Sequence, residues 1–396
     1  MRLYIDWKGE LNLITAIVSV VMFLVMVSLH EFGHFIVAKM LNFKVDEFSV
    51  GMGPAIFKKK KGETQYSIRI LPLGGYCKFE GEDEADNTDP RAFSNQKPWK
   101  RLLVLLAGGV FNIILGFVLF LVIVPSTSPA RTNVIDTVVP HSYIEQVGVQ
   151  PNDKIIKING KKINFYNDIS LYTQNFKKDE QATVTVSRNG EKIDYSFMPT
   201  EQIVKTTYGE NGVQVDSTIN GYTTGQFVEY SDKMPKDDSI VGQSETSTRY
   251  IIGFTPKTKD ITIFNVWGEA LNETKFVVKL VYQSFWQMIT GKVGVDQMSG
   301  PVGIVSEVNN AVNSGSYSWL YVLNLVALLT INLGIFNLLP IPALDGGRIL
   351  FVLIEMIRRK AIPPEKEGIV HAVGMLLLLA FIVFVSFHDI MRLFNK

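Results

Sequence analysis

The sequence has little cysteine, little histidine and almost no net charge. Its one cysteine, Cys77, excludes a disulfide framework and any zinc site built from two or four cysteines. The 39 Lys and Arg residues balance 38 Asp and Glu residues, so nothing in the charge points to nucleic acid. Only 19% of residues are charged and the mean hydropathy is +0.17, which does not suit a purely water-soluble chain of 396 residues. The composition favours a mixed membrane and globular protein.

Four runs without Asp, Glu, Lys or Arg are each long enough to cross a hydrocarbon core of about 30 Å as a helix. They are residues 11–29, 102–125, 319–344 and 369–387. The first run could be the apolar part of a signal peptide. However, it is longer than such segments, lacks a small-x-small cleavage site and continues as helix-compatible sequence. We therefore expect four transmembrane helices, with the first one retained.

Lysine and arginine predict how the chain is oriented in the membrane. They are abundant in the loop 42–100 and recur in 348–366, and such short basic segments stay in the cytoplasm. With four spans, both chain ends and the segment 126–318 then lie outside the cytoplasm. This topology fits a multi-pass protein of a bacterial plasma membrane.

The segment 126–318 begins with a region rich in predicted strands. Apolar and polar residues alternate in several short runs, and Asn189-Gly190 predicts a hairpin turn between the last two. These runs are 133–139, 154–163, 182–186 and 193–197. We expect a compact β-rich domain here.

One stretch of this region, 148–160, is similar to PDZ domains, in which a Gly-rich turn and an Asp precede a strand that ends in Asn-Gly. Asn152 stands where glycine is usual, and 140–145 is not a clear loop for a peptide carboxylate. The resemblance therefore implies a PDZ-like fold more firmly than it implies peptide binding.

The rest of the middle segment is less regular. Residues 201–257 are polar with scattered strand-like runs, which we do not assign to a second complete domain. Apolar residues then recur at helical spacing from Trp267 to Met288. They predict an amphipathic helix that lies on the membrane surface or packs on the β-rich domain.

Two of the five histidines stand one helical turn apart at the end of the first span, in His30-Glu31-Phe32-Gly33-His34. On a helix both imidazoles can bind one Zn²⁺, and Glu31 can accept a proton from metal-bound water. The alternative is a group of interfacial polar residues that reach to water at a helix end. Ionisable groups that continue directly from an apolar span are costly, so we predict a functional zinc site.

A catalytic zinc ion takes a third protein ligand and keeps an open position for water. The third span runs into the segment 337–347, where two prolines remove backbone donors and Gly346-Gly347 free the chain from helical geometry. Asp345 is expected there in locally unwound backbone, at the same membrane level as the two histidines. A simple Pro-Gly turn with a capping Asp is the alternative. The remaining histidines, His141, His371 and His388, do not follow the spacing of metzincins or related soluble zinc proteases.

Together these two motifs resemble the site-2 protease family of intramembrane zinc metalloproteases, in particular its bacterial branch with an extracytoplasmic PDZ domain. Shorter similarities occur at 48–54, at 71–76 with Gly81-Glu82 after it, and at 299–304.

The resemblance implies that His30, His34 and Asp345 ligate Zn²⁺, that Glu31 is the general base and that Asn337 helps to hold the substrate backbone. Asn112 resembles part of a motif of the second span. Because Gly109 replaces the proline that is frequent there, we assign Asn112 no catalytic role.

The resemblance also implies a membrane-associated β-hairpin region at 48–79 that pairs with an extended substrate. Pairing is physically sensible because a transmembrane helix hides its scissile carbonyl in intrahelical hydrogen bonds. We expect Gly51, Gly53, Gly74 and Gly75 to permit the bends of this substrate-binding region. An ordinary role as loop glycines is an equal alternative.

The predicted function is an intramembrane zinc metalloprotease that cleaves single-span membrane proteins in regulated intramembrane proteolysis. The implied substrates are a pre-trimmed anti-sigma factor or a signal-peptide remnant. The implied partners are the substrate, the lipid bilayer and an upstream site-1 protease that makes the first cut. Two alternatives stay open, a membrane transporter with an intramembrane Asp ion site and an inactive PDZ scaffold. The lack of an inverted repeat disfavours the transporter, and the intact zinc residues disfavour the scaffold.

The predicted fold class is a multi-pass α-helical membrane protein with an inserted β-rich PDZ-like domain outside the cytoplasm. The expected parts in chain order are the first transmembrane helix (1–41), a cytoplasmic loop with the hairpin region (42–100), the second transmembrane helix (101–125), the PDZ-like domain (126–200), a β-rich extension (201–262), an amphipathic helical region (263–318), the third transmembrane helix (319–347), and a cytoplasmic turn with the fourth transmembrane helix (348–396).

Overall fold

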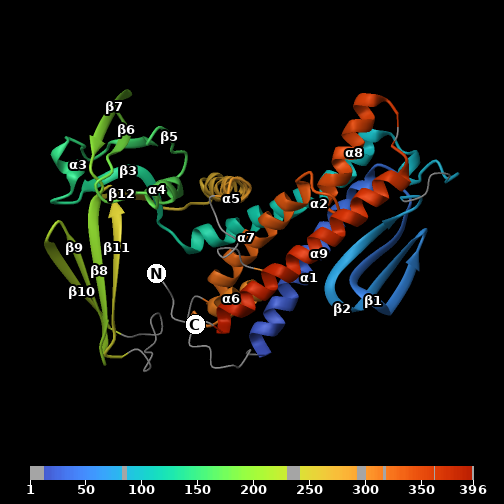
Figure 1. The fold of residues 1–396 in the computed structure, drawn as a ribbon, viewed down its shortest axis with the longest axis horizontal. Coiled ribbons are helices and arrows are strands. Elements are labelled where there is room, and N and C mark those ends of the chain that lie inside the picture. Colours follow the sequence, from blue (N-terminus) through green and yellow to red (C-terminus); the bar gives the residue numbers. More distant parts are fainter. Residues whose placement is uncertain are drawn as a thin grey trace. The chain divides into compact units, whose positions relative to one another are not determined.

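In the computed structural model, most of the chain forms two compact units (Figure 1). The helical unit comprises the described residues of Met1–Phe120, Glu273–Ser314 and Ser318–Lys396, and the β-rich unit those of Leu121–Asn272. The described residues are 13–82, 87–229, 241–291, 300–314, 318–360 and 362–394. The first two residues of the predicted span 11–29, and Ser299 of the motif at 299–304, lie outside them.

Four helices in the described residues are long and apolar enough to cross a membrane. They are α1 (Leu13–Met40), α2 (Pro98–Ser126), α7 (Ser318–Leu338) and α9 (Pro364–Phe394). In its most apolar window α2 has 44% of its residues buried, whereas α9 has only 11%. Thus α2 is the most enclosed of these helices, and α9 leaves most of its apolar surface free for lipid. These helices and the separate antiparallel sheets agree with a membrane protein that carries a β-rich domain.

Glycines let α2 approach its neighbours at backbone distance. A Cβ on Gly109 of α2 would lie 2.7 Å from the carbonyl oxygen of Gly334 on α7, and one on Gly334 would lie 2.6 Å from that of Gly109. A Cβ on Gly33 of α1 would lie 2.7 Å from the carbonyl oxygen of Ala107 on α2. Small residues at such contacts are the usual basis of close helix packing in membranes, and here they bring α1 and α7 against α2.

The hairpin region is formed by β1 (Val45–Lys61) and β2 (Thr64–Phe79), and both strands bend sharply. Phe48 pairs with both Cys77 and Tyr66, and Tyr66 also pairs with Lys59. The two bent strands therefore form a sheet of four antiparallel segments in the order 75–79, 45–50, 64–69 and 55–61.

The bends lie at glycines with positive φ, which other residues adopt only under strain. Gly51, Gly53 and Gly74 have φ values of 85°, 80° and 95°. Gly75 has an ordinary φ but a close neighbour, because a Cβ there would lie 2.7 Å from the carbonyl oxygen of Ser49. At each of these four positions the local backbone therefore favours glycine over a larger residue.

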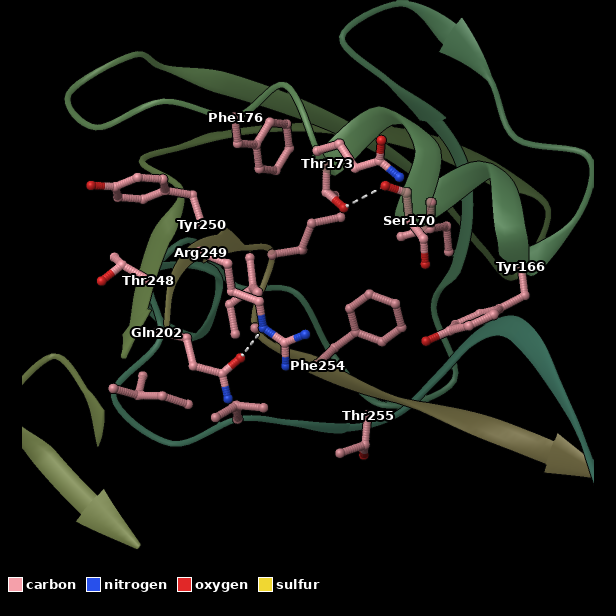
Figure 2. Close-up of a pocket in the computed structure, with 17 residues that line it drawn as sticks. Tyr166, Ser170, Thr173, Phe176, Gln202, Thr248, Arg249, Tyr250, Phe254 and Thr255 are labelled. Carbon is pink, nitrogen blue, oxygen red and sulfur yellow. Dashed lines mark hydrogen bonds between the residues drawn. The ribbon is translucent and has the colours of Figure 1, made fainter. Parts of the chain in front are cut away.

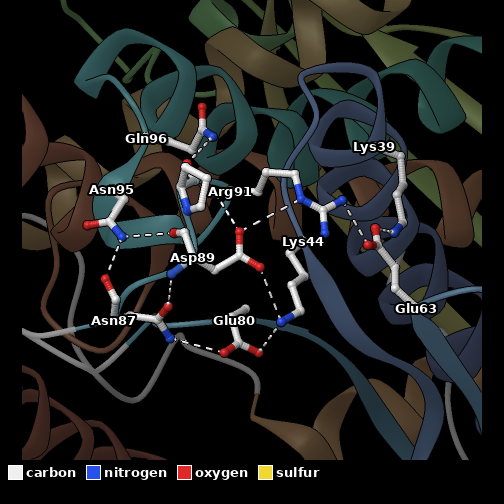
Figure 3. Close-up of polar contacts among 10 residues, drawn as sticks. Lys39, Lys44, Glu63, Glu80, Asn87, Asp89, Arg91, Asn95 and Gln96 are labelled. Atoms are coloured by element: carbon white, nitrogen blue, oxygen red, sulfur yellow. Dashed lines mark hydrogen bonds and ion pairs between the residues drawn. The ribbon is translucent and has the colours of Figure 1, made fainter.

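A network of ion pairs ties the hairpin turn to the end of α1 (Figure 3). Glu63, in the turn, accepts hydrogen bonds from Lys39 of α1 and from Arg91, each at 2.8 Å. Lys44 lies 3.3 Å from both Glu80 and Asp89. The hydrogen bond from Lys39, followed by that from Arg91, holds the pKa of the Glu63 carboxyl below its usual value. The 3₁₀ turn η1 (Phe93–Asn95) follows the loop that carries Asp89 and Arg91.

The third apolar helix ends earlier than the sequence predicts. α7 stops at Leu338, a short break contains both prolines, and Asp345 then opens a new helix, α8 (Asp345–Arg358). The expectation of unwound backbone at Asp345 and a plain turn after residue 347 is therefore wrong. Hydropathy alone overlooks α8 because this helix is amphipathic: Ile349 and Val352 pack into the same core as Leu105 of α2, while its other face is polar or exposed.

Two further helices complete the helical part of the chain. α5 (Val266–Ile289) occupies the predicted amphipathic stretch, and α6 (Pro301–Val312) lies later in the expected helical region 263–318. The backbone N–H groups of Gly300 and Gly303 donate to the buried Asp389 carboxylate of α9 at 2.9 and 2.8 Å. Asp389 therefore caps α6 and holds it against α9.

In the β-rich unit, the predicted strand region forms one antiparallel sheet in the order β12-β3-β4-β6-β7, with β5 paired to β4. The strands of this sheet are β3 (Ala130–Val138), β4 (Lys154–Ile158), β5 (Lys161–Lys162), β6 (Ala182–Arg188), β7 (Glu191–Phe197) and β12 (Phe254–Lys259). Two short helices, α3 (Tyr143–Gln146) and α4 (Tyr166–Thr173), lie between strands in the chain. Its core includes Ile135, Ile155, Val184 and Val186, which are at most 1% exposed. Apolar alternation predicts this buried face correctly.

The polar extension forms a second sheet. Four antiparallel strands stand in the order β10-β9-β8-β11 and lead back to β12, which pairs with β3. They are β8 (Thr200–Tyr208), β9 (Gly212–Ile219), β10 (Tyr222–Glu229) and β11 (Ser244–Ile251). The extension is thus an insertion between two strands of the first sheet.

Candidate active site

The two motif histidines and Asp345 meet in the helical unit as the sequence predicts. His30 and His34 are each 6% exposed on α1, and their Nε2 atoms lie 3.3 Å apart. Asp345 Oδ2 lies 3.0 Å from His30 Nε2 and 3.2 Å from His34 Nε2. Zinc bonds of about 2.0 Å at tetrahedral angles separate neighbouring ligand atoms by about 3.3 Å. The three atoms are therefore spaced as one face of a tetrahedral zinc site, and the donor set fits the ion.

Space for the two imidazoles comes from a glycine on α2. A Cβ on Gly108 would lie 2.3 Å from His34 Nε2 and 2.8 Å from His30 Cε1, far inside contact distance. Gly346 has a similar role behind Asp345, because a Cβ there would overlap the carbonyl of Leu339. The ligand group therefore depends on backbone packing at two glycines.

The outer ring nitrogens of the two histidines face different partners on α2. His34 Nδ1 lies 2.8 Å from the carbonyl oxygen of Val104, so it donates its proton there and leaves Nε2 free to bind a metal. His30 Nδ1 faces the Asn112 carboxamide, whose Nδ2 lies 3.5 Å away.

Glu31 connects the ligand group to the hairpin. Its Oε2 accepts a hydrogen bond of 3.0 Å from the backbone N–H of Cys77, which belongs to the edge segment 75–79. A carboxylate beside two metal-binding imidazoles, directed towards a strand edge, is well placed to exchange protons with a reacting group on that edge. Burial, followed by the nearby Glu31 charge, raises the pKa of the Cys77 thiol, so Cys77 stays protonated.

His371 supports the loop that carries Asp345, rather than belonging to the ligand group. Ala343 adopts a positive φ of 79°, and its backbone N–H donates to His371 Nδ1 at 2.9 Å. His141 stacks on Tyr222 in the β-rich unit, and His388 contacts the ring of Phe384 on α9. In the part of the chain that the structure describes, one group of side chains could hold a metal ion, and it consists of His30, His34 and Asp345; we call it the metal-binding group.

Asn337 lies in the last turn of α7 and is partly exposed. Its carboxamide makes no hydrogen bond to any described residue, so it is free to bind another backbone. Gly51, Gly53, Gly74 and Gly75 lie at the bends of the hairpin.

Sequence reasoning missed Gly108 and the role of His371. Gly108 stands in the motif that ends at Asn112, but only the helix contact shows what its missing side chain avoids. His371 carried a signal as an ionisable group inside an apolar run.

The β-rich unit contains a separate cavity of about 740 Å³ (Figure 2). Its walls come from α4, from the end of β11 and from β12, which is an edge strand of its sheet. Phe176 and Phe254 give it apolar surface, and the Arg249 side chain enters it while donating to Gln202 Oε1 at 2.7 Å. An edge strand opposite a helix is a geometry that can accept an extended peptide.

Known proteins match nearly the whole chain. The model of peptidase family M50 matches residues 18–381. A protein of Clostridium acetobutylicum named as a zinc metalloprotease is 33% identical over 96% of this chain and 98% of its own length. One of Fusobacterium nucleatum with the same description is 33% identical over 96% of this chain and all of its own length. The zinc metalloprotease RasP of Oceanobacillus iheyensis is 29% identical over 96% of this chain and 99% of its own. This chain therefore belongs to peptidase family M50, the site-2 protease family of zinc metalloproteases.

Proposed function

We propose that this membrane-embedded protease cleaves single-span membrane proteins within or near the bilayer, after their outer part has been trimmed. The observation that carries the proposal is the position of Glu31, which lies between a zinc-ligand group and the edge of a β-sheet. A transmembrane helix must be unwound before its peptide bonds can react, and a sheet edge beside the ligand group can hold the unwound segment in an extended form.

His30, His34 and Asp345 would hold the metal, and Glu31 would handle the protons. When bound, zinc makes water a stronger acid and polarises the scissile carbonyl. Glu31 accepts the proton of the attacking water and later delivers it to the leaving amine. Gly108 and Gly346 keep the ligand group compact, so the geometry does not have to be rebuilt in each turnover.

The segment 75–79 would hold the unwound substrate as an added strand. It is an edge segment, so its outer N–H and C=O groups can pair with an extended chain. The positive φ values at Gly51, Gly53 and Gly74 support this arrangement because they bend the strands so that 75–79 remains at the edge. The unpaired carboxamide of Asn337 is a second group able to bind the substrate backbone.

The substrates that the resemblance to the family implies are an anti-sigma factor already cut by a site-1 protease, or a signal-peptide remnant. By the positive-inside rule, the active site lies towards the cytoplasm and the β-rich unit outside. Exposed apolar residues of the hairpin, including Ile56, Phe57 and Ile70, suit contact with lipid.

The β-rich unit would act as a PDZ-like filter. A bulky outer domain on a substrate would clash with it, and its cavity offers an edge strand to a trimmed end. Removing residues 129–259 should allow cleavage of an untrimmed substrate. Unchanged selectivity would contradict this filter and leave the protease assignment intact.

The central experiment compares the wild type with Glu31→Gln in lipid vesicles that contain a short single-span substrate. We expect Glu31→Gln to keep zinc and to lose cleavage by roughly 100-fold or more, because the metal ligands remain while the proton acceptor is gone. Glu191→Gln, an exposed glutamate on β7, is the matched control and should cleave normally.

Cleavage that survives in Glu31→Gln would contradict the proposal. Zinc absent from the wild type would instead favour the transporter or scaffold alternatives. Cleavage of a soluble peptide at the same rate as the spanning substrate would contradict the substrate class alone.

A further inference from the structure

The hydrogen bonding of Asn112, beside the metal-binding group, does not match what a zinc-binding His30 requires. It lies on α2, is 0% exposed and faces His30, with its Nδ2 atom 3.5 Å from His30 Nδ1. Its Oδ1 atom is buried and has no hydrogen-bond partner among the described residues. A buried carboxamide oxygen without a partner is uncommon in folded proteins and calls for an explanation.

The explanation lies in the tautomer that a zinc-binding histidine requires. The Nε2 atoms of His30 and His34 both face Asp345, so Nε2 is the metal-binding atom in each ring. Nδ1 must then carry the proton and needs an acceptor. For His34 that acceptor is the carbonyl oxygen of Val104. For His30, the group in the corresponding place is the Asn112 carboxamide.

We propose that Asn112 is a positioning residue whose Oδ1 accepts a hydrogen bond from His30 Nδ1 and thereby fixes His30 as a zinc ligand through Nε2. With Nδ2 towards His30, two donors would face each other in that tautomer, and Oδ1 would stay without a partner. A half-turn of the carboxamide exchanges its two nearly isosteric ends and supplies the missing acceptor. One rotation thus satisfies both the ring and the orphaned oxygen.

The environment of Asn112 favours an orienting role over a role as a simple helix contact. Its side chain is enclosed where α2 meets α1 and α7, and its backbone carbonyl separately accepts a hydrogen bond of 3.4 Å from Thr330 on α7. The contact between α2 and α7 therefore does not depend on the carboxamide. This division of roles allows the two to be tested separately.

The inference rests on His30 being a zinc ligand, as proposed above. The test measures zinc affinity by competition with a chelator, and the absorption spectrum of the cobalt-substituted protein, for three variants of the full chain. Asn112→Leu keeps the shape but removes the acceptor. Asn112→Asp restores an acceptor. Thr330→Val removes the neighbouring α2 to α7 hydrogen bond and leaves the carboxamide in place.

We expect Asn112→Leu to bind zinc roughly 10-fold to 100-fold more weakly and to show a changed cobalt spectrum, as happens when an outer partner of a ligand is lost. Asn112→Asp should recover most of the affinity, and Thr330→Val should bind both metals as the wild type does. Wild-type zinc affinity with an unchanged cobalt spectrum in Asn112→Leu would overturn the proposal. So would equal weakening in Asn112→Leu and Thr330→Val, which would indicate a packing role.

His30→Ala separates this inference from the ligand assignment itself. If His30→Ala loses zinc while Asn112→Leu keeps it, only the role of Asn112 is wrong. If His30→Ala keeps zinc at wild-type affinity, the proposed ligand set is wrong. Should Asn112→Asp not fold, the zinc titrations of Asn112→Leu and Thr330→Val still decide the question, because the first lacks the carboxamide and the second keeps it while losing the neighbouring hydrogen bond.

Discussion

The metal-binding group of the helical unit and the cavity of the β-rich unit are built in opposite ways. His30, His34 and Asp345 are held where helices approach at backbone distance, and a single Cβ on Gly108 would fill their space. The cavity has about 740 Å³ of room and is walled by side chains such as Arg249. The first site leaves no room for an added methyl group, whereas the second has room for a ligand. Catalysis depends on fixed distances between its groups, whereas an open cavity beside an edge strand imposes no such distances.

The largest expected effect comes from filling the tight site. Gly108→Ala places a methyl group 2.3 Å from the present position of His34 Nε2, so the ring must move. A displacement of this size costs on the order of 100-fold in activity. We expect zinc content and cleavage of the single-span substrate to fall together. Gly268→Ala on α5, where nothing lies within 4 Å of the added Cβ, is the control and should behave as the wild type.

A smaller effect is expected behind Asp345. His371→Leu removes the acceptor of the Ala343 N–H, which holds the loop two residues before Asp345. Loss of such a supporting hydrogen bond should weaken zinc binding and cleavage roughly 10-fold. His388→Leu, on the same helix, removes a ring contact remote from that loop and is the control. Equal behaviour of the two variants would show that the loop does not need His371.

The sequence predicted the parts of the site that obey local rules. His30 and His34 are one helical turn apart, and topology placed Asp345 at their level, so periodicity and charge were enough. Gly108 could not be found in this way, because its importance is a distance to residues more than 70 positions earlier in the chain. The same holds for the fold: alternation located the strand β6, whereas the return of β12 to β3 across a 52-residue extension is a long-range pairing.

A substitution at the buried Asp153 should lower the stability of the β-rich unit without changing the zinc content of the protein. Asp153 is 1% exposed and accepts two hydrogen bonds of 2.7 Å from Arg188. Burial alone would raise the Asp153 pKa, but the Arg188 hydrogen bonds and the Gln150 N–H outweigh it and lower that pKa. Asp153→Asn should lower the free energy of unfolding of this unit by about 3 kcal/mol, as expected when a buried pair loses one partner.

The pH dependence of this contribution has a definite sign. Because the folded-state pKa of Asp153 is lowered, the stabilisation is fully present above the unfolded value of about 3.9 and is lost as the pH falls through the lower folded value. Thermal unfolding followed from pH 7 to pH 3 should show that the wild type loses stability as the pH falls, and that Asp153→Asn loses less. Zinc content at pH 7 should be equal in both proteins, and zinc loss in the variant would contradict the separation of the two regions.

The smallest effect is expected at the ion-pair network that joins the hairpin turn to α1. Its charges are exposed or half-buried, so each pair contributes little to the position of the hairpin. Glu63→Gln weakens the links of the hairpin turn to Lys39 and Arg91, and each such pair contributes about 0.2 to 1 kcal/mol. Because glutamine keeps an oxygen that can accept hydrogen bonds, we expect about half of the combined maximum of about 2 kcal/mol to be lost. A loss of about 1 kcal/mol corresponds to a roughly fivefold fall in cleavage. The difference in cleavage from the wild type should shrink in 0.5 M salt, where such charges are screened.

Glu245→Gln, at an exposed residue of β11, is the control and should not change cleavage at either salt concentration. A loss of cleavage as large as that of Gly108→Ala would mean that the hairpin must be held as rigidly as the metal-binding group. The hairpin would then belong with the tightly fixed part of the molecule.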